Sequence, residues 1–246
     1  QEEFEIRKEA ALTCAKLAVH PGEEVTTKGK KGVVVSDIIS KLLIVGISDR
    51  DPEIRRTVLS SLAPRYDVFL GTVENLKCLF MGLNDEVFEI RSLSIGIIGR
   101  LAIQNPAYVM PSLRKTLVQL LTELEFSGNP RNKEESAKLL TRLIQSSGPI
   151  TRPYAKTILD ALLPKVHDES PRVASAVLAA LGELSKVAED EMKGCVDELF
   201  PLILNTLKDQ SSVFTREIAL RALGQLVSNL GNVIEHYERY PTLMPI

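Results

Sequence analysis

The sequence predicts an all-α fold, an α-solenoid (a superhelix) of about six repeats, each built from an antiparallel pair of helices. Three observations lead to this prediction. The word FEIR occurs twice, at 4–7 and 88–91, which are 84 residues apart. An apolar stripe recurs about every 42 residues, which is half of that distance. The composition favours aliphatic side chains, with 44% hydrophobic residues, 5% aromatic residues and no Trp, so we expect cores of Leu, Ile, Val and Ala.

The 246-residue chain is nearly balanced in charge, with 30 basic and 32 acidic side chains and a formal net charge of −2. Such a balance gives no overall field that would attract nucleic acid or a membrane surface. No apolar run approaches the roughly 20 residues that span a bilayer. We therefore expect no nucleic-acid partner and no direct membrane insertion.

The chain opens on QEEFEIRKEA, already in a helical rhythm and without an initiator Met, so we expect a piece of a longer protein. Its three cysteines, Cys14, Cys78 and Cys195, are spaced neither as a disulfide framework nor as metal ligands. Each lies in an apolar helical pattern, so we expect buried, reduced thiols and a cytoplasmic or nuclear location.

Six segments align on the basic residue of FEIR, and five of them carry Leu ten residues later. Counted from these anchors, residues at +3, +4, +7, +8 and +10 are apolar or small, which is the stripe of an amphipathic helix. The +3 and +8 positions are mostly small, so we expect a neighbouring helix to approach this face closely, and we interpret the recurrent Gly at +8 as packing. In the two copies of FEIR, Ile6 and Ile90 are expected to pack inward. The anchors are Arg7, Arg55, Arg91, Lys133, Ala174 and Arg216, separated by 48, 36, 42, 41 and 42 residues.

A second apolar helix is predicted before most anchors, and internal Pro111, Pro164 and Pro201 predict kinks in these helices. Residues 20–33 are expected to form a flexible basic loop, because their Gly and Lys residues do not match a phosphate-binding pattern. Residues 126–136 predict another irregular turn, interpreted as a connector in preference to a partner contact. The predicted first helices are 34–47, 72–83, 105–124, 152–166 and 196–207. The predicted repeats are about 1–20 (partial), 34–66, 72–103, 105–147, 152–189 and 194–231, with the start of a further one at 237–246.

The turn between the two helices carries Asp six or seven residues before several anchors. An Asp there can cap the second helix, and an Arg one turn into that helix can reach the Asp of an adjacent repeat, which would form a ladder along the stack. The residues predicted to form the turns and the ladder are Asp49, Arg55, Asp85, Arg91, Asp168, Asp209 and Arg216.

Two repeats depart from this pattern. One has Ser127 and Lys133 in place of Asp and Arg, and the next keeps Asp168 but has Ala174. We therefore expect the ladder to be broken there. A turn Asp followed six residues later by Arg, at a period near 42, nevertheless resembles the HEAT repeat.

No stretch of the sequence carries a catalytic or cofactor-binding pattern. The three histidines have no Cys or His at metal-ligand spacing, and the nucleophile-elbow, dinucleotide-binding and kinase motifs are absent. Stacked helix pairs offer surfaces rather than enclosed pockets. We therefore expect no enzymatic activity, cofactor, metal or small-molecule substrate in this segment, and protein partners instead.

One stretch goes beyond generic repeat character: NPAYVMPSLRKTLVQLLTELEFSGNPRNKEESAKLLTRLIQSSGPITRPY, at 105–154. It resembles the N-terminal HEAT region of the target-of-rapamycin (TOR) kinases, which are phosphatidylinositol-3-kinase-related protein kinases. The similarity continues upstream through 41–62 and 84–106, and downstream through 181–203 and 222–243. It thus extends over most of the chain, and the 20–34 insertion is its least similar part.

The resemblance implies a scaffold segment of a much longer chain whose serine/threonine kinase domain lies elsewhere. It implies docking of raptor-type and rictor-type regulatory subunits and of other parts of the parent kinase, in TORC1-type complexes that couple nutrients to growth signalling. It also implies a cytoplasmic location, with lysosomal or vacuolar membranes reached through partners. No partner-binding residue follows from the resemblance.

Two other functions fit the repeats. The first is a stand-alone HEAT-repeat adaptor, such as a phosphatase scaffold or a transport receptor, which kinase motifs later in the full-length chain would exclude. The second, less favoured, is a nucleic-acid-binding solenoid, which would need a basic stripe with interleaved aromatic residues.

Overall fold

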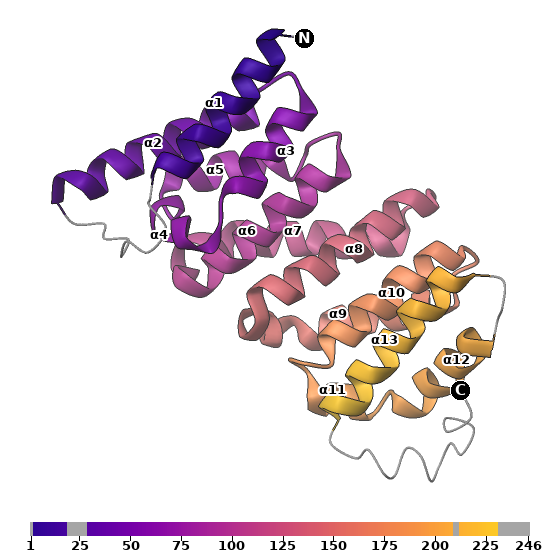
Figure 1. Ribbon diagram of the computed structural model, residues 1–246. Coiled ribbons are helices and arrows are strands. Elements are labelled where there is room, and N and C mark those ends of the chain that lie inside the picture. The colour runs from indigo at the N-terminus through magenta and orange to yellow at the C-terminus, as the bar shows by residue number, and fades with distance from the viewer. Residues whose placement is uncertain (1, 19–28, 209–211, 231–246) are drawn as a thin grey trace. The chain divides into compact units, whose positions relative to one another are not determined.

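The computed structural model describes residues 2–18, 29–208 and 212–230, and these residues form helices joined by turns, with no strand among them (Figure 1). The all-α prediction is therefore confirmed for this part of the chain. The chain divides into two compact parts, an N-terminal part, Gln1–Arg114, and a C-terminal part, Lys115–Ile246. Each part is described by itself.

The N-terminal part is built in two layers of helices. Helix α3 packs between α1 and α6, and these three carry the FEIR-type anchors. Helix α2 packs on α3 and beside α5, so the first helices of the repeats form the other layer. The elements are α1 (Glu2–Ala18), α2 (Gly29–Ile47), α3 (Pro52–Ser61), a 3-10 turn (Pro64–Tyr66), α4 (Asp67–Leu70), α5 (Val73–Gly82) and α6 (Phe88–Gln104).

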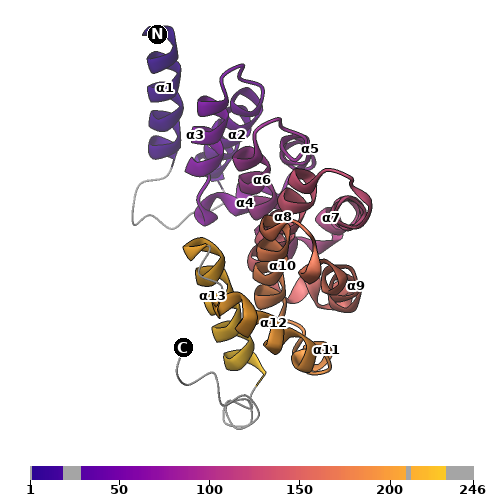
Figure 2. The ribbon, with the colours of Figure 1, turned by 90° about the vertical axis from the view of Figure 1, so that its right-hand side faces the viewer.

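Helix α7 (Pro106–Phe126) spans the boundary between the two parts. In the C-terminal part, α10 lies between α8 and α13, and α12 packs on α13 (Figures 1 and 2). The elements here are α8 (Pro130–Ser147), a 3-10 segment (Gly148–Tyr154), α9 (Ala155–Leu162), a 3-10 segment (Leu163–His167), α10 (Pro171–Leu184), α11 (Glu189–Lys193), α12 (Val196–Lys208) and α13 (Val213–Asn229).

The prolines predicted inside the first helices occupy two kinds of position. Pro111 and Pro201 lie inside α7 and α12, within the continuous helices where the sequence places them. Pro164 instead stands at the start of the 3-10 segment that follows α9, where the missing amide of Pro costs least.

The buried core is aliphatic, as the composition predicts. Leu, Ile, Val and Ala make up nearly all of its apolar members, and the buried aromatic residues among those described are Tyr66, Phe69 and Phe200. Ile90 of the second FEIR is fully buried, as expected. A close-packed core of aliphatic side chains tolerates little change in volume.

Close helix approach depends on glycine at the crossing of the two helices within a repeat. A Cβ added to Gly46 at the end of α2 would lie 2.5 Å from Val58 Cγ1 of α3, at the +3 position of that helix. A Cβ on Gly82 of α5 would collide in the same way with Ser94 of α6, also at +3. The +3 residue therefore faces the first helix of its own repeat.

Glycine at +8 serves contact between repeats in the C-terminal part. A Cβ on Gly182 of α10 would lie 3.2 Å from Ala222 Cα of α13 and would collide with Gln225. The packing interpretation is confirmed for Gly182. At Gly224 of α13 a Cβ would meet none of the described atoms within 4 Å.

Helix α1 departs from the predicted packing. Ile6 is 63% exposed, and none of the α1 side chains that the structure describes is buried. The inward packing expected for Ile6 is therefore wrong. Cys14, at +7, is also exposed, which corrects the expected burial of this thiol, whereas Cys78 and Cys195 are half-buried. Burial raises the pKa of Cys78, and burial followed by nearby Glu198 and Asp160 raises the pKa of Cys195.

The predicted loop at 20–33 ends earlier than expected. Helix α2 begins at Gly29, so residues 29–33 are helical. Residues 19–28, Asp209 and the further repeat expected at 237–246 lie outside the described residues.

The crossing at Gly46 provides a direct test. We expect Gly46→Ala to lower the free energy of unfolding by about 2 kcal/mol, because the stiff side chain of Val58 cannot move away from the new methyl group. Chemical denaturation followed by circular dichroism measures the change. The matched control is Gly224→Ala, which adds the same methyl group to a helix in open space and should stabilise by up to about 1 kcal/mol. Equal effects of the two substitutions would contradict the close approach.

Candidate functional site

The turns before the second helices share one hydrogen-bond arrangement. Asp49 Oδ1 accepts the amide of Asp51 at 2.8 Å, and Asp85 Oδ1 accepts the amide of Val87 at 2.9 Å. In the C-terminal part, Asp168 Oδ1 accepts the amide of Ser170 at 3.0 Å. Ser127, which replaces Asp, does the same for Asn129 at 3.2 Å.

This arrangement refines the capping role expected of the turn Asp. The N-cap residues of α3, α6, α8 and α10 lie two positions later, at Asp51, Val87, Asn129 and Ser170. The turn Asp therefore satisfies the amide of the N-cap residue rather than an amide of the first helical turn. Val87 and Ser170 make no side-chain cap of their own, so the acceptor two residues earlier orders the entry to the helix.

The same carboxylates also meet the basic residue of the preceding repeat. Arg7 of α1 donates to Asp49 through Nε at 3.1 Å and Nη2 at 3.4 Å. Arg55 Nη2 donates to Asp85 Oδ1 at 3.1 Å, and Arg55 Nε lies 2.8 Å from Asp85 Oδ2. The contact between Arg55 Nε and Asp85 is an ion pair only, since the buried Nε–H makes no hydrogen bond.

Arg55 also holds the turn of its own repeat. Its Nη1 donates to the carbonyls of Asp49 at 2.9 Å and Arg50 at 3.3 Å. The side chains of Arg55 and Asp85 are only 9% and 12% exposed. Burial alone would lower the pKa of Arg55, but the carboxylate of Asp85 raises it above its ordinary value, so the guanidinium stays charged.

The ladder continues where the sequence predicts a break. Lys133 Nζ donates to Asp168 Oδ2 at 2.9 Å, so Lys takes the place of Arg in this rung. The expected break is therefore wrong at Lys133, because an ammonium on a long side chain reaches the same carboxylate. Burial would raise the pKa of Asp168, but the hydrogen bonds from Lys133 and from the Ser170 amide lower it below its ordinary value.

The remaining predicted ladder residues are placed as follows. Arg91 Nη1 donates to the carbonyls of its own turn, at Asp85 (2.6 Å) and Glu86 (3.3 Å), as Arg55 does in the preceding repeat. Arg216 lies in the first turn of α13, and its buried Nε has no hydrogen-bond partner among the described residues. Asp209, which the sequence pairs with this turn, lies outside them.

Sequence reasoning missed a second set of polar contacts at the other end of the second helices. Arg100 of α6 clamps the buried carboxylate of Asp67 with two hydrogen bonds of 2.9 Å. Gln225 of α13 donates to the buried Glu183 of α10 at 2.6 Å. Arg100, Glu183 and Gln225 all lie nine residues after their anchors, between apolar positions +8 and +10. A polar residue recurring at +9 is the signal that could have found them.

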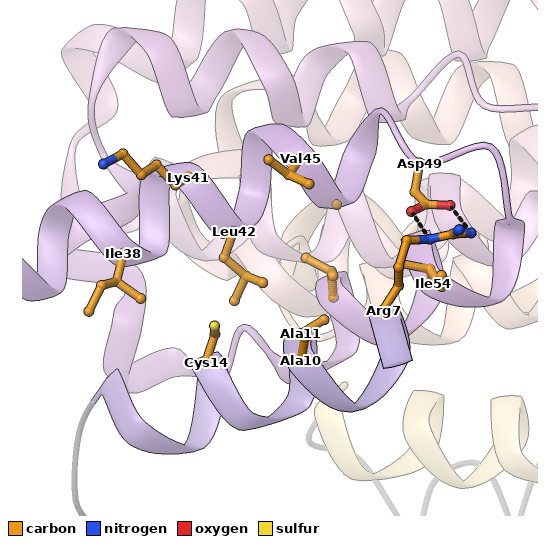
Figure 3. Close-up of a pocket in the computed structure, with 12 residues that line it drawn as sticks. Arg7, Ala10, Ala11, Cys14, Ile38, Lys41, Leu42, Val45, Asp49 and Ile54 are labelled. Atoms are coloured by element: carbon orange, nitrogen blue, oxygen red, sulfur yellow. Dashed lines mark hydrogen bonds and ion pairs between the residues drawn. The ribbon is translucent and has the colours of Figure 1, made fainter. Parts of the chain in front are cut away.

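A groove of about 400 Å³ lies between α1, α2 and α3 (Figure 3). Its walls are mainly aliphatic, and the Arg7–Asp49 ion pair stands at one end. Among the described residues, no group of three or more His, Cys, Asp or Glu side chains is placed to hold a metal ion. Within the same described ranges, no helix has the length and apolar character needed to cross a membrane.

Removing a ladder carboxylate should weaken the stack without unfolding the helices. We expect Asp85→Ala to lower the free energy of unfolding by about 2 kcal/mol, because the nearly buried Arg55 keeps only its 3.3 Å contact with the exposed Glu86. Thermal unfolding followed by circular dichroism should show a lower Tm with helicity retained. Asp37→Ala removes an exposed pair with Lys41 and should change stability by less than about 0.5 kcal/mol. An unchanged Tm for Asp85→Ala would contradict this role.

The Lys133–Asp168 rung predicts a pH dependence. Since the folded-state pKa of Asp168 is lowered, its stabilisation is complete above the ordinary carboxyl pKa of about 3.9 and is lost as pH falls through the folded value. Lys133→Met should cost about 1–2 kcal/mol at pH 7, and the difference from the parent protein should shrink below about pH 4. Urea unfolding across a pH series measures the difference, with Lys138→Met, which removes a more exposed ammonium, as control. A difference that does not change with pH would count against the rung.

Family models of two HEAT classes match the chain. The HEAT-repeat domain of the proteasome adapter and scaffold protein ECM29 matches residues 107–195, and a HEAT-like repeat matches residues 171–226. Among solved structures, Kap121p superposes with a TM-score of 0.61 over 99% of this chain and 27% of its own, at 16% sequence identity. An engineered protein superposes with a TM-score of 0.53 over 90% of each chain, at 18% identity. These likenesses confirm the α-solenoid fold.

Similarity in sequence is much stronger to one group of kinases. The chain is 47% identical to serine/threonine-protein kinase tor1 of Schizosaccharomyces pombe over 98% of its length, and 48% identical to TOR2 of Saccharomyces cerevisiae over 100%. It is 43% identical to mTor of Drosophila melanogaster over 100%. In each case it spans about 10% of the relative. The chain therefore belongs to the target-of-rapamycin serine/threonine kinase family, as a HEAT-repeat region of such a kinase.

Proposed function

We propose that this segment is a non-catalytic scaffold in the N-terminal region of a TOR-type serine/threonine kinase, whose catalytic domain lies in another part of the parent chain. In this proposal the segment docks raptor-type or rictor-type regulatory subunits and other parts of the kinase. The resulting complexes act in nutrient-dependent growth signalling, in the cytoplasm and at lysosomal or vacuolar surfaces reached through partners. The identity of 43–48% to TOR kinases over nearly the whole chain carries this proposal.

The proposal includes the repeat boundaries and the ladder. Each turn carboxylate orders its own helix entry and contacts the preceding repeat, as at Asp49 and Asp85. Such contacts fix neighbouring repeats, so that the outward helix faces form a surface of defined shape. A scaffold needs this property more than it needs any reactive side chain.

Helix α7 offers the surface best suited to a protein partner. In the C-terminal part, Phe126 at the end of α7 is 73% exposed. Val118, which is 59% exposed, lies eight residues earlier on a neighbouring side of the same helix. Exposed aromatic and aliphatic residues on one face are typical of binding surfaces.

A stand-alone adaptor is the weaker alternative. The superposition on Kap121p supports a common fold only, at 16% identity. Identity to TOR kinases is about three times higher and extends over the same residues.

Substitution on α7 in the full-length kinase tests the docking role. We expect Phe126→Ser to reduce co-purification of a raptor-type or rictor-type subunit by about tenfold, the loss typical of removing a buried aromatic anchor. Val213→Ser, which removes an exposed side chain of α13, is the control and should leave co-purification unchanged. Kinase activity towards a short peptide should stay the same in both variants. Normal capture of both subunit types by Phe126→Ser would exclude this face as the docking surface.

A further inference from the structure

The N-terminal end of helix α2 extends beyond its neighbour α5. Asn75 of α5 donates a hydrogen bond to Ser40 of α2, 35 residues earlier in the chain. A Cβ on Gly82 of α5 would lie 3.5 Å from Ile47 Cδ1 of α2, which is again 35 residues earlier. The two helices therefore run in the same direction in one register, and α5 begins level with the middle of α2. Residues 29–37 of α2, here called the overhang, extend beyond the start of α5 (Figure 1).

A cleft of about 500 Å³ lies between α2 and the short helix α4. One face of α2 forms one wall, with hydroxyl groups at Ser36 and Ser40, and Val68 and Phe69 of α4 form the other. Both rims of the cleft are apolar, because Val33 is 67% exposed and Val68 is 51% exposed. The volume falls within the range of about 300–1,000 Å³ that is typical of ligand sites.

A buried side chain joins the two walls of this α2–α4 cleft. Asn75, which is fully buried, donates through Nδ2 to Ser40 Oγ at 3.0 Å and to the carbonyl oxygen of Phe69 at 3.0 Å. One amide group therefore fixes both walls to the start of α5. The cleft is preformed, and a preformed site loses less conformational entropy when it binds.

The overhang has an unfavourable sequence for a helix, GKKGVVVSD. Gly and the β-branched Val both have low helix propensity. In addition, Val33 and Val34 are 67% and 56% exposed, so this end of α2 leaves apolar surface in water. Departures from local preference of this kind are expected where a segment serves binding as well as folding.

Most charged side chains next to the cleft are basic. Lys30 and Lys31 are exposed in the overhang, and Arg65 is exposed in the turn before α4. The acidic residue that lines the cleft, Asp37, forms an ion pair with Lys41 at 2.7 Å. The N-terminus of α2 adds the positive end of a helix dipole. The electrostatic potential at the cleft therefore favours an occupant with negative charge.

We propose that the α2–α4 cleft binds a short acidic segment of a partner protein. An aliphatic side chain of the segment enters between Val33 and Val68, and a carboxylate close to it in sequence pairs with Lys30 or Lys31. An anionic membrane would satisfy the same charges, but a flat bilayer does not fill a concave cleft, whereas peptide groups can bond to hydroxyl groups on its wall. The proposal does not depend on the docking proposed for α7.

Photo-cross-linking in the full-length kinase, isolated from cells with its bound subunits, tests the occupant. A benzophenone-bearing residue at position 33 should cross-link to a partner peptide that has Asp or Glu within four residues of the cross-linked site. The same residue at position 81, where Met81 is 64% exposed on α5, should not give this peptide. A cross-link from position 33 to residues 19–28 of the same chain, or to a peptide without acidic residues, would overturn the proposal, as would the absence of any cross-link.

Charge reversal provides a second readout. We expect Lys30→Glu to lower the yield of the cross-link from position 33 about fivefold, because the new carboxylate repels the acidic segment. A carboxylate near a helix N-terminus favours the helix, so α2 should stay folded in this variant. Lys77→Glu makes the same change at an exposed position of α5 outside the cleft and should leave the yield unchanged. Equal yields from the two variants would contradict an acidic occupant.

Sedimentation with phosphatidylserine vesicles distinguishes a membrane from a protein partner. We expect the full-length kinase and its Val33→Asp variant to sediment with these vesicles to the same extent. A loss of vesicle binding in Val33→Asp would assign the overhang to a membrane surface and overturn the proposal.

Discussion

A carboxylate in the turn between two helices is the interaction on which each repeat depends. Asp85 accepts the amide at the entry of α6 and, through the same side chain, receives Arg55 of the preceding repeat. One residue therefore fixes both the start of a helix and its distance to a neighbour. Because Arg55 also binds the carbonyls of its own turn, two successive turns are linked through one guanidinium. The pair is nearly buried, so removing one partner costs more than the pair itself contributes.

The second constraint is the distance between helix axes, which small residues set at the crossings. Gly46 and Gly82 admit the +3 side chain of the following helix, and Gly182 admits α13. The turn carboxylates lie at the N-terminal end of the second helix, and the glycine contacts lie along its length. The polar +9 contacts lie towards its C-terminal end. A helix held at both ends and in the middle has a defined register, which is why an aliphatic core with few aromatic residues can still specify one packing.

Much of this architecture could be predicted from the sequence, because repetition makes the period visible without knowledge of contacts. The anchors, the apolar stripe and the turn carboxylates all follow from local spacing. The failures share one cause, since each depends on what lies beside a residue in space. Ile6 and Cys14 have the same pattern as buried residues in later repeats, but both are exposed because no described helix covers them. Lys133 keeps its rung because a long flexible side chain tolerates the replacement, which spacing alone cannot show. The partner of Glu183 lies 42 residues away and becomes evident only once the register between α10 and α13 is known.

The division of labour within a repeat explains how such a chain can serve as a scaffold. Second helices such as α3 and α10 are enclosed by neighbours, and their buried positions leave little freedom for change. First helices such as α7 have one buried stripe and one outward face, and residues on the outward face do not pack against other helices of the repeats. Phe126 lies on this outward face, and its large exposed ring costs the fold little. Selection for binding can therefore act on the outward faces while the turn carboxylates and the glycine crossings keep the geometry constant.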